Sequence, residues 1–74
     1  MNSVQCRMAR AGLEWSGKEL SDMTGVRTAT ISAFEKGGAA LTTTVDKLKH
    51  AFLVTGRVRF EGDSGVFVAP KVDV

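Results

Sequence analysis

Apolar residues recur every three or four positions along most of the chain and alternate with polar residues near its C-terminal end. The first spacing is that of a helix with one buried face, and the second is that of a strand. In residues 3–13 the recurring residues are Cys6, Ala9 and Leu13. This spacing predicts a helix with Ser3 as its N-cap.

Residues 17–36 predict two short helices joined by a tight turn. Ser16 and Glu19 have the spacing of a capping box, so the first of these helices begins at Gly17. Gly25 stands where that helix ends, because glycine readily adopts the positive φ that such an end requires. The residues predicted to face inward are Leu20, Ser21, Val26, Ile31 and Phe34.

The second of these two helices has one free face. Counting about 100° per residue from Ile31 places Phe34 on the same, buried side. The opposite side carries Ala29, Ser32, Ala33 and Lys36. This second side is therefore open to a partner.

Another helix is predicted further along the chain. Val45, Leu48 and Phe52 recur at helical spacing, and Leu41 is predicted to join them in the core. One of the threonines at positions 42–44 is predicted to cap this helix.

The pattern changes after Gly56. Residues 57–61 alternate between polar and apolar, residues 62–65 have the composition of a turn, and residues 66–69 form a second apolar run. This order predicts a β-hairpin. Because an isolated hairpin is marginal in water, its apolar residues need a cover. That cover is either the preceding helix of the same chain or the hairpin of a second copy.

The residues between Gln5 and Leu48 resemble the DNA-binding domain of the phage repressor and Cro family, also called the XRE family of bacterial regulators. The matching residues are QCRMAR at 5–10, Trp15-Ser16, Glu19-Leu20, Gly25-Val26, Thr30-Ile31-Ser32 and Phe34-Glu35-Lys36-Gly37. The resemblance implies a mostly α, four-helix, lambda-repressor-like helix-turn-helix domain. The chain would then be a single domain, 1–74, with a helix-turn-helix core at 3–55 and a C-terminal β-hairpin extension at 57–69.

The resemblance also implies which residues meet DNA. In this family the second helix of the motif enters the major groove, which is wide enough for one helix. The implied base-reading residues are Arg27, Thr28, Ala29, Ser32 and Ala33. The implied phosphate contacts are Gly17, Lys18, Lys36, Gly38 and Ala39.

Arg27 leaves two roles open. Its guanidinium has the geometry to read a guanine, and it is equally suited to holding a phosphate. The family usually has a serine or threonine at this position, where it caps the helix, so the cap is predicted to be lost or passed to Thr28. Arg10 and Glu35 stand where family members make a partly buried ion pair, and we expect that pair here in preference to two solvated charges.

Members of this family usually bind two-fold operators as dimers, so of the two covers for the hairpin we favour a second copy. The residues predicted to dimerise are Val58, Phe60, Val66, Phe67 and Val68. The expected function is that of a transcription regulator, an autoregulating repressor from a phage-like setting that binds a palindromic operator as a homodimer. The alternative is an antitoxin-type protein-interaction module whose hairpin binds a partner protein.

Bulk charge does not decide between these functions. The net charge is +2 and the isoelectric point is about 9.0, values that are compatible with nucleic acid without establishing it. Within residues 17–36 three basic and three acidic residues balance: Lys18, Arg27 and Lys36 against Glu19, Asp22 and Glu35. The prediction of DNA binding therefore depends on the motif.

Other classes of protein fit the sequence poorly. Catalytic pairs and phosphate-binding loops are missing at usable spacing, which predicts a protein that is not an enzyme and has no cofactor or small-molecule ligand. Cys6 and His50 are single residues of their types and predict no metal site. The sequence has neither a membrane-spanning run nor a signal-peptide pattern, which predicts a cytoplasmic protein.

Overall fold

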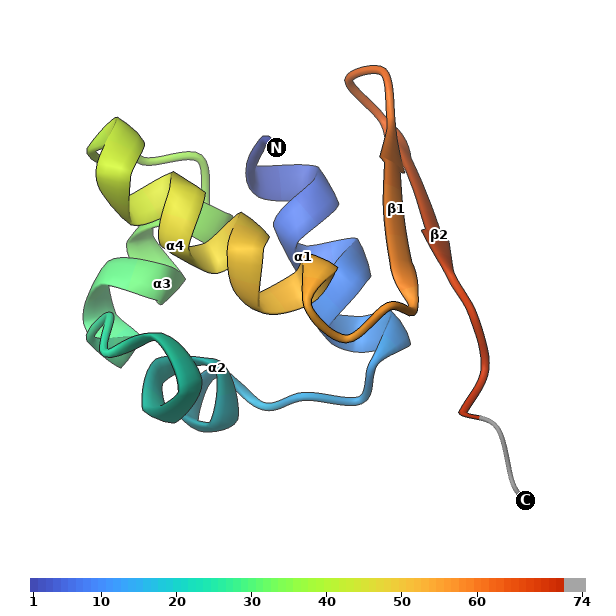
Figure 1. Ribbon diagram of the computed structural model, residues 1–74. Coiled ribbons are helices and arrows are strands. Elements are labelled where there is room, and N and C mark those ends of the chain that lie inside the picture. Colours follow the sequence, from blue (N-terminus) through green and yellow to red (C-terminus); the bar gives the residue numbers. More distant parts are fainter. Residues whose placement is uncertain (72–74) are drawn as a thin grey trace.

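The computed structural model of the chain describes residues 1–71. Four helices come first, and an antiparallel hairpin follows them. The elements are α1 (Ser3–Gly12), α2 (Gly17–Thr24), α3 (Thr28–Glu35), α4 (Thr42–Leu53), β1 (Val58–Glu61) and β2 (Gly65–Val68). The hairpin and α3 lie on opposite sides of the molecule, with α1 and α4 between them (Figure 1). The prediction of a mostly helical chain with a C-terminal hairpin is confirmed.

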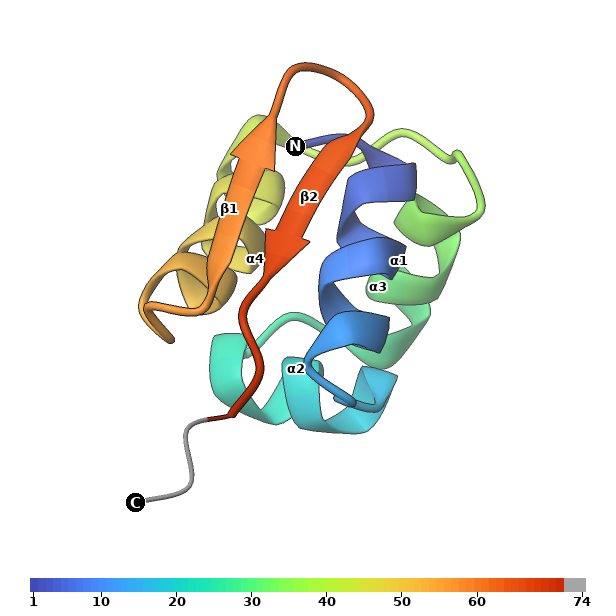
Figure 2. The ribbon, with the colours of Figure 1, turned by 90° about the vertical axis from the view of Figure 1, so that its right-hand side faces the viewer.

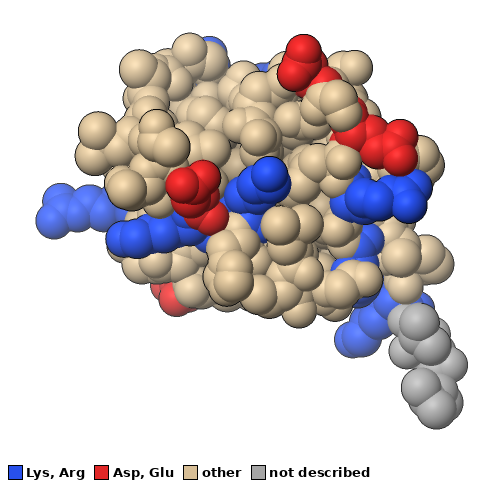
Figure 3. Space-filling view, turned by 45° about the horizontal axis from the view of Figure 1, so that its top comes forward, with Lys and Arg blue, Asp and Glu red and all other residues tan. Residues whose placement is uncertain are grey.

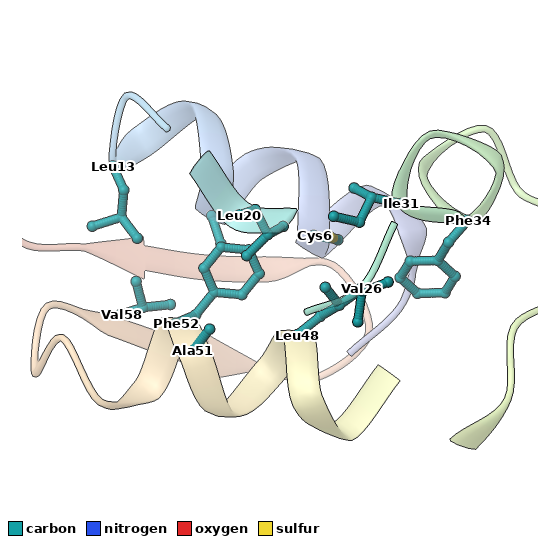
Figure 4. Packing of buried hydrophobic residues seen from close by; sticks show 11 residues of the cluster. Cys6, Leu13, Leu20, Val26, Ile31, Phe34, Leu48, Ala51, Phe52 and Val58 are labelled. Carbon is teal, nitrogen blue, oxygen red and sulfur yellow. The ribbon is translucent and has the colours of Figure 1, made fainter. Parts of the chain in front are cut away.

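The core forms where α1, α2, α3 and α4 meet. Phe52 and Leu48 of α4 are fully buried and point toward the other helices (Figure 4). Phe52 also stacks against Trp15, with ring centroids 5.7 Å apart, and meets the edge of Phe60 in β1. The remaining buried apolar residues are Cys6, Ala9, Leu13, Leu20, Val26, Ile31, Phe34, Ala51 and Val58. One core therefore serves both the helices and the hairpin.

Helix α2 begins and ends as the sequence predicts. Ser16 Oγ accepts the backbone N–H of Glu19, and the Glu19 carboxylate accepts the N–H of Ser16, which completes the capping box. Gly25 ends the helix with φ of 76°, and its N–H donates to the carbonyl of Ser21.

The starts of α1 and α4 differ from the prediction. Helix α1 is capped by Asn2 in place of Ser3, because the Asn2 side chain accepts the N–H of Gln5 while the Gln5 side chain accepts the N–H of Asn2. Helix α4 has Leu41 at its N-cap, with no side-chain hydrogen bond and no capping threonine. Leu41 is 74% exposed, so the prediction that it joins the core is wrong.

The end of α1 contains a strained residue. Glu14 has φ of 59°, in the left-handed region that favours glycine. Its N–H donates to the carbonyl of Ala11, and the N–H of Trp15 donates to that of Arg10, which is the hydrogen-bond pattern of a Schellman motif. A glutamate thus makes this turn in a backbone conformation that glycine adopts more easily.

The hairpin packs on helices of its own chain. Its register pairs Val58 with Val68 and Phe60 with Val66, and these four residues face inward. In Figure 2, β1 lies in front of α4 and β2 lies beside α1. The sequence analysis favoured a second copy as the cover, whereas the structure places α1 and α4 of the same chain there. Phe67 alone of the five predicted dimerisation residues is exposed.

Helix α1 holds the hairpin turn through side-chain amides. Gln5 Nε2 donates to the carbonyls of Gly62 at 2.9 Å and Gly65 at 3.1 Å, and Asn2 Nδ2 donates to the carbonyl of Asp63. Gly12 lies so close to Val68 that a Cβ at this position would clash with it. These contacts fix the hairpin against α1.

Candidate nucleic-acid interface

Helix α3 presents an exposed face of small side chains. Its first turn follows Val26, which is buried, and its inward residues Ile31 and Phe34 are 1% and 8% exposed. All five predicted base-reading residues are exposed: Arg27, Thr28, Ala29, Ser32 and Ala33. No other part of residues 1–71 covers this face, so the predicted division of α3 into a buried and a free side is confirmed.

An ion pair from α1 holds the end of α3. Arg10 Nε and Nη2 donate to the two carboxylate oxygens of Glu35 at 2.9 and 2.8 Å, a bidentate arrangement. Arg10 Nη1 also donates to the carbonyl of Trp15. Glu35 is 7% exposed, so the predicted pairing of these residues is confirmed in a largely buried site.

Cys6 is the third residue of this site. Its contact with Glu35 was not predicted from the sequence. Its Sγ lies 3.4 Å from Glu35 Oε2 and donates to it. Burial, followed by the neighbouring Glu35 charge, raises the pKa of the Cys6 thiol from 9.0 to about 12. The pKa of Arg10 is raised above its ordinary value, chiefly by its hydrogen bond to Glu35. Cys6 is therefore a neutral hydrogen-bond donor in the core.

The ends of α3 place two basic residues beside the exposed face. Arg27 occupies the N-cap position and its side chain makes no capping hydrogen bond, so the cap is lost and the side chain stays exposed. Lys36 is exposed at the other end. Beyond it, the N–H of Gly37 donates to Phe34 and that of Gly38 donates to Ala33, which closes the helix with a Schellman motif.

The start of α2 supplies fewer free groups than predicted. The backbone N–H groups of Gly17 and Lys18 belong to the first helical turn and have no acceptor within it. Lys18 Nζ, however, pairs with Asp22 at 2.9 Å, and this hydrogen bond raises the pKa of Lys18. Both side chains are exposed, so a phosphate that displaced Asp22 would break only a weak surface pair.

Charges of both signs are mixed on the face shown in Figure 3. Lys and Arg side chains lie there in several places, some of them next to acidic ones, with uncharged residues between them. The acidic residue of α3, Glu35, is turned inward and paired with Arg10. The exposed face from Arg27 to Lys36 therefore carries two positive charges and no negative one.

The sequence reasoning assigned no contact or role to two further residues. Thr30 is exposed on α3 beside the predicted readers. Gln5 is 2% exposed and ties α1 to the hairpin turn. The sequence signal for this contact is the helical spacing of Gln5, Ala9 and Gly12, which places them on one side of α1.

The described part of the chain supports neither a metal site nor a membrane-spanning helix. Within residues 1–71, no group of three or more His, Cys, Asp or Glu residues is placed to hold a metal ion. None of the helices described there has the length and apolar character needed to cross a membrane.

Comparison with known proteins adds no assignment, since no family model and no curated protein matches this chain.

Proposed function

We propose that this protein is a helix-turn-helix DNA-binding transcription regulator of the lambda-repressor type, in which α3 enters the major groove. The observation that carries the proposal is the exposed face of α3, whose small side chains are flanked by Arg27 and Lys36. An α-helix fits the major groove, and a face without bulky or acidic side chains approaches base edges closely. The proposed role is that of an autoregulating repressor.

Other parts of the site support the same role. Gly25 sets the turn between α2 and α3 with its positive φ, and the Arg10–Glu35 pair fixes the far end of α3. We expect the backbone at Gly17, Gly38 and the neighbouring loop to meet phosphates on either side of the groove. Arg27 either reads a guanine or holds a phosphate.

The test introduces a negative charge on the exposed face of α3. Ala33→Glu places a carboxylate against the DNA, and like-charge repulsion is expected to lower affinity for a duplex selected from a random pool by about tenfold or more. His50→Glu adds the same charge on an exposed part of α4 and is the matched control. Affinity is measured by fluorescence anisotropy, and thermal melting checks that both variants fold.

Two results would contradict the proposal. If the wild-type protein selected no sequence from the pool, the proposal that it binds specific DNA would be wrong. An equal loss of affinity in Ala33→Glu and His50→Glu would mean that α3 is not the interface.

The homodimer remains part of the proposal, with a revised interface. The inward face of the hairpin is occupied by the chain's own core, so a second copy has the outer edge of β2 to pair with. Strand β2 carries no charged residue, whereas β1 carries Arg59 and Glu61. Charges on edge strands oppose pairing, so the β2 edge is the less protected one.

Apolar residues of α1 continue this surface. Val4 and Met8 are 44% and 41% exposed on α1, which runs beside β2 (Figure 2). A partner strand added to β2 would cover them. Phe67→Lys is expected to shift the protein from dimer to monomer in analytical ultracentrifugation, and Leu53→Lys on α4 is the control. A dimer that persists in Phe67→Lys would place the interface elsewhere.

A further inference from the structure

The outer face of the hairpin, turned away from α1 and α4, carries an aromatic ring next to a cationic group. Phe67 is 54% exposed on this face. Its cross-strand neighbour Arg59 lies with the guanidinium carbon 4.8 Å from the centre of the ring. In Figure 2 this face is toward the viewer, with β1 in front of α4. A single exposed ring is ordinary on a protein surface, so its surroundings decide whether it marks a site.

The ring borders a hollow of about 420 Å³ on the hairpin. Arg57, Arg59 and Phe67 line this hollow, and its remaining lining residues are uncharged. Arg57 Nε donates to the carbonyl of Ala69 at 2.9 Å, which holds its guanidinium beside the hollow. Glu61 lies 3.3 Å from Arg59 Nη2, but both side chains are more than half exposed, so this is a weak surface pair. The hollow is therefore cationic and has an aromatic wall.

These groups suit a partner that combines negative charge with flat rings. A guanidinium binds a phosphate through its paired N–H donors, and an aromatic ring stacks on a nucleobase. Because Arg59 already lies over Phe67, a stacked base and the phosphate next to it would both find their partners at one place. Each nucleotide of a nucleic acid supplies one base and one phosphate.

A single strand fits this face better than a duplex does. In a duplex each base is covered by its neighbours, whereas the bases of a single strand are free to leave the stack and lie on an aromatic side chain. The hairpin and α3 lie on opposite sides of the molecule (Figure 1), so a duplex bound by α3 does not reach Phe67. An acidic peptide would pair with the arginines and would leave the ring without a stacking partner.

We propose that the outer face of the hairpin binds single-stranded nucleic acid, with a base stacked on Phe67 and adjacent phosphates held by Arg57 and Arg59. This site is separate from the proposed duplex interface on α3. A second copy that pairs with the β2 edge uses backbone groups, so the outer face stays open in the proposed dimer. The site has little sequence preference, because every base has a face to stack and phosphates carry no sequence information.

The first experiment tests the stacking ring. Fluorescence anisotropy measures binding of a labelled oligothymidylate, a DNA strand that forms no duplex with itself. Phe67→Leu keeps an apolar side chain and removes the ring, so it is expected to lower the affinity about tenfold, within the range for one base stacked on an aromatic side chain. Phe67→Tyr keeps the ring and is expected to bind like the wild type.

The second experiment tests the arginines through the salt dependence. Arg59→Gln is expected to lower the slope of log affinity against log salt concentration by about 0.7, the value of one phosphate contact on a single strand. Arg7→Gln removes the same charge from an exposed position of α1 and is the matched control. It is expected to leave the slope unchanged. Thermal melting checks that every variant folds.

Three results would overturn the inference. The first is no binding of oligothymidylate up to about 100 µM protein, the weak end of non-specific nucleic-acid binding. The second is equal affinity of Phe67→Leu and Phe67→Tyr, or an effect of Arg7→Gln as large as that of Arg59→Gln. The third is tighter binding of polyglutamate than of oligothymidylate, which would assign the face to acidic peptides.

The variant Ala33→Glu separates this inference from the proposed function. It changes α3 alone, so it is expected to lose affinity for the selected duplex and to keep its affinity for oligothymidylate. Loss of both would place the single strand on α3 and would overturn the hairpin site. A wild-type protein that binds oligothymidylate and selects no duplex would contradict the proposed function and leave the hairpin site standing.

Discussion

Helix α1 holds the two ends of the molecule by different chemistry. At the hairpin end, the neutral amides of Gln5 and Asn2 donate to backbone carbonyls of the turn. At the α3 end, the charged guanidinium of Arg10 holds the carboxylate of Glu35, and the Cys6 thiol donates to the same carboxylate. One helix thus positions both the proposed DNA-reading element and the proposed dimer element.

The two kinds of contact differ in what their loss costs. A neutral hydrogen bond contributes about 0.5–1.5 kcal/mol, and the hairpin is also held by the packing of its inward apolar residues. Removing one partner of a buried ion pair leaves the other charge stranded, which costs about 3–5 kcal/mol. The position of α3 therefore depends on a single side chain far more than the position of the hairpin does.

The largest expected effect is at the charged contact. Arg10→Met keeps most of the side-chain volume and leaves Glu35 buried without a cation, so the free energy of unfolding is expected to fall by about 3–5 kcal/mol. Urea denaturation measures this loss. The double variant Arg10→Met, Glu35→Leu removes both charges and is expected to recover most of it. A loss in Arg10→Met of less than about 1 kcal/mol would mean that the pair behaves as a surface pair.

The next effect depends on pH. Because the pKa of Cys6 is about 12 in the folded chain and 9.0 ordinarily, the unfolded chain loses this proton first as the pH rises. Stability is therefore full below pH 9 and falls above it, by about 1.4 kcal/mol per pH unit until the folded thiol ionises. The raised pKa of Arg10 affects the stability only at pH values above those at which Cys6 ionises.

A Cys6→Ala variant isolates this contribution, because every other titrating group is shared. The difference in unfolding free energy between wild type and variant is expected to shrink steadily from pH 9 to pH 11. A constant difference over that range would show that Cys6 ionises alike in the folded and unfolded chains.

The smallest effect is at the neutral contact. Gln5→Leu keeps the volume of the side chain and removes its two hydrogen bonds to the turn together with its capping bond to the Asn2 N–H, for an expected loss of about 1–2 kcal/mol. Hydrogen exchange is expected to speed up in β1 and β2 and to stay unchanged in α3. Arg7→Leu, at an exposed position of the same helix, is the control. Faster exchange in α3 instead would mean that the two ends are not held separately.

Local patterns predicted much of this fold. The capping box of Ser16 and Glu19, the turn at Gly25, and the spacing of Ile31 and Phe34 each depend on residues within one or two helical turns. Such signals survive in any tertiary context, because the hydrogen bonds and the period that produce them are local. The free face of α3 followed from the same spacing.

Errors arose where neighbouring residues offered the same local chemistry. Asn2 and Ser3 are both good N-caps, and the position of the Gln5 side chain decided for Asn2. Helix α4 begins without a side-chain cap although threonines were available. Glu14 takes a backbone conformation that its residue type disfavours, and the structure around it compensates the cost of about 1–2 kcal/mol.

The sequence by itself determined the order of the helices and strands and which side of most of them is apolar, since helical and strand periods are properties of neighbouring residues. Only the tertiary structure decided that the hairpin covers α1 and α4 of its own chain, that Gln5 holds its turn, and that Cys6 joins the pair of Arg10 and Glu35. These contacts join residues far apart in the chain, and the apolar pattern of a strand is the same whichever surface it covers.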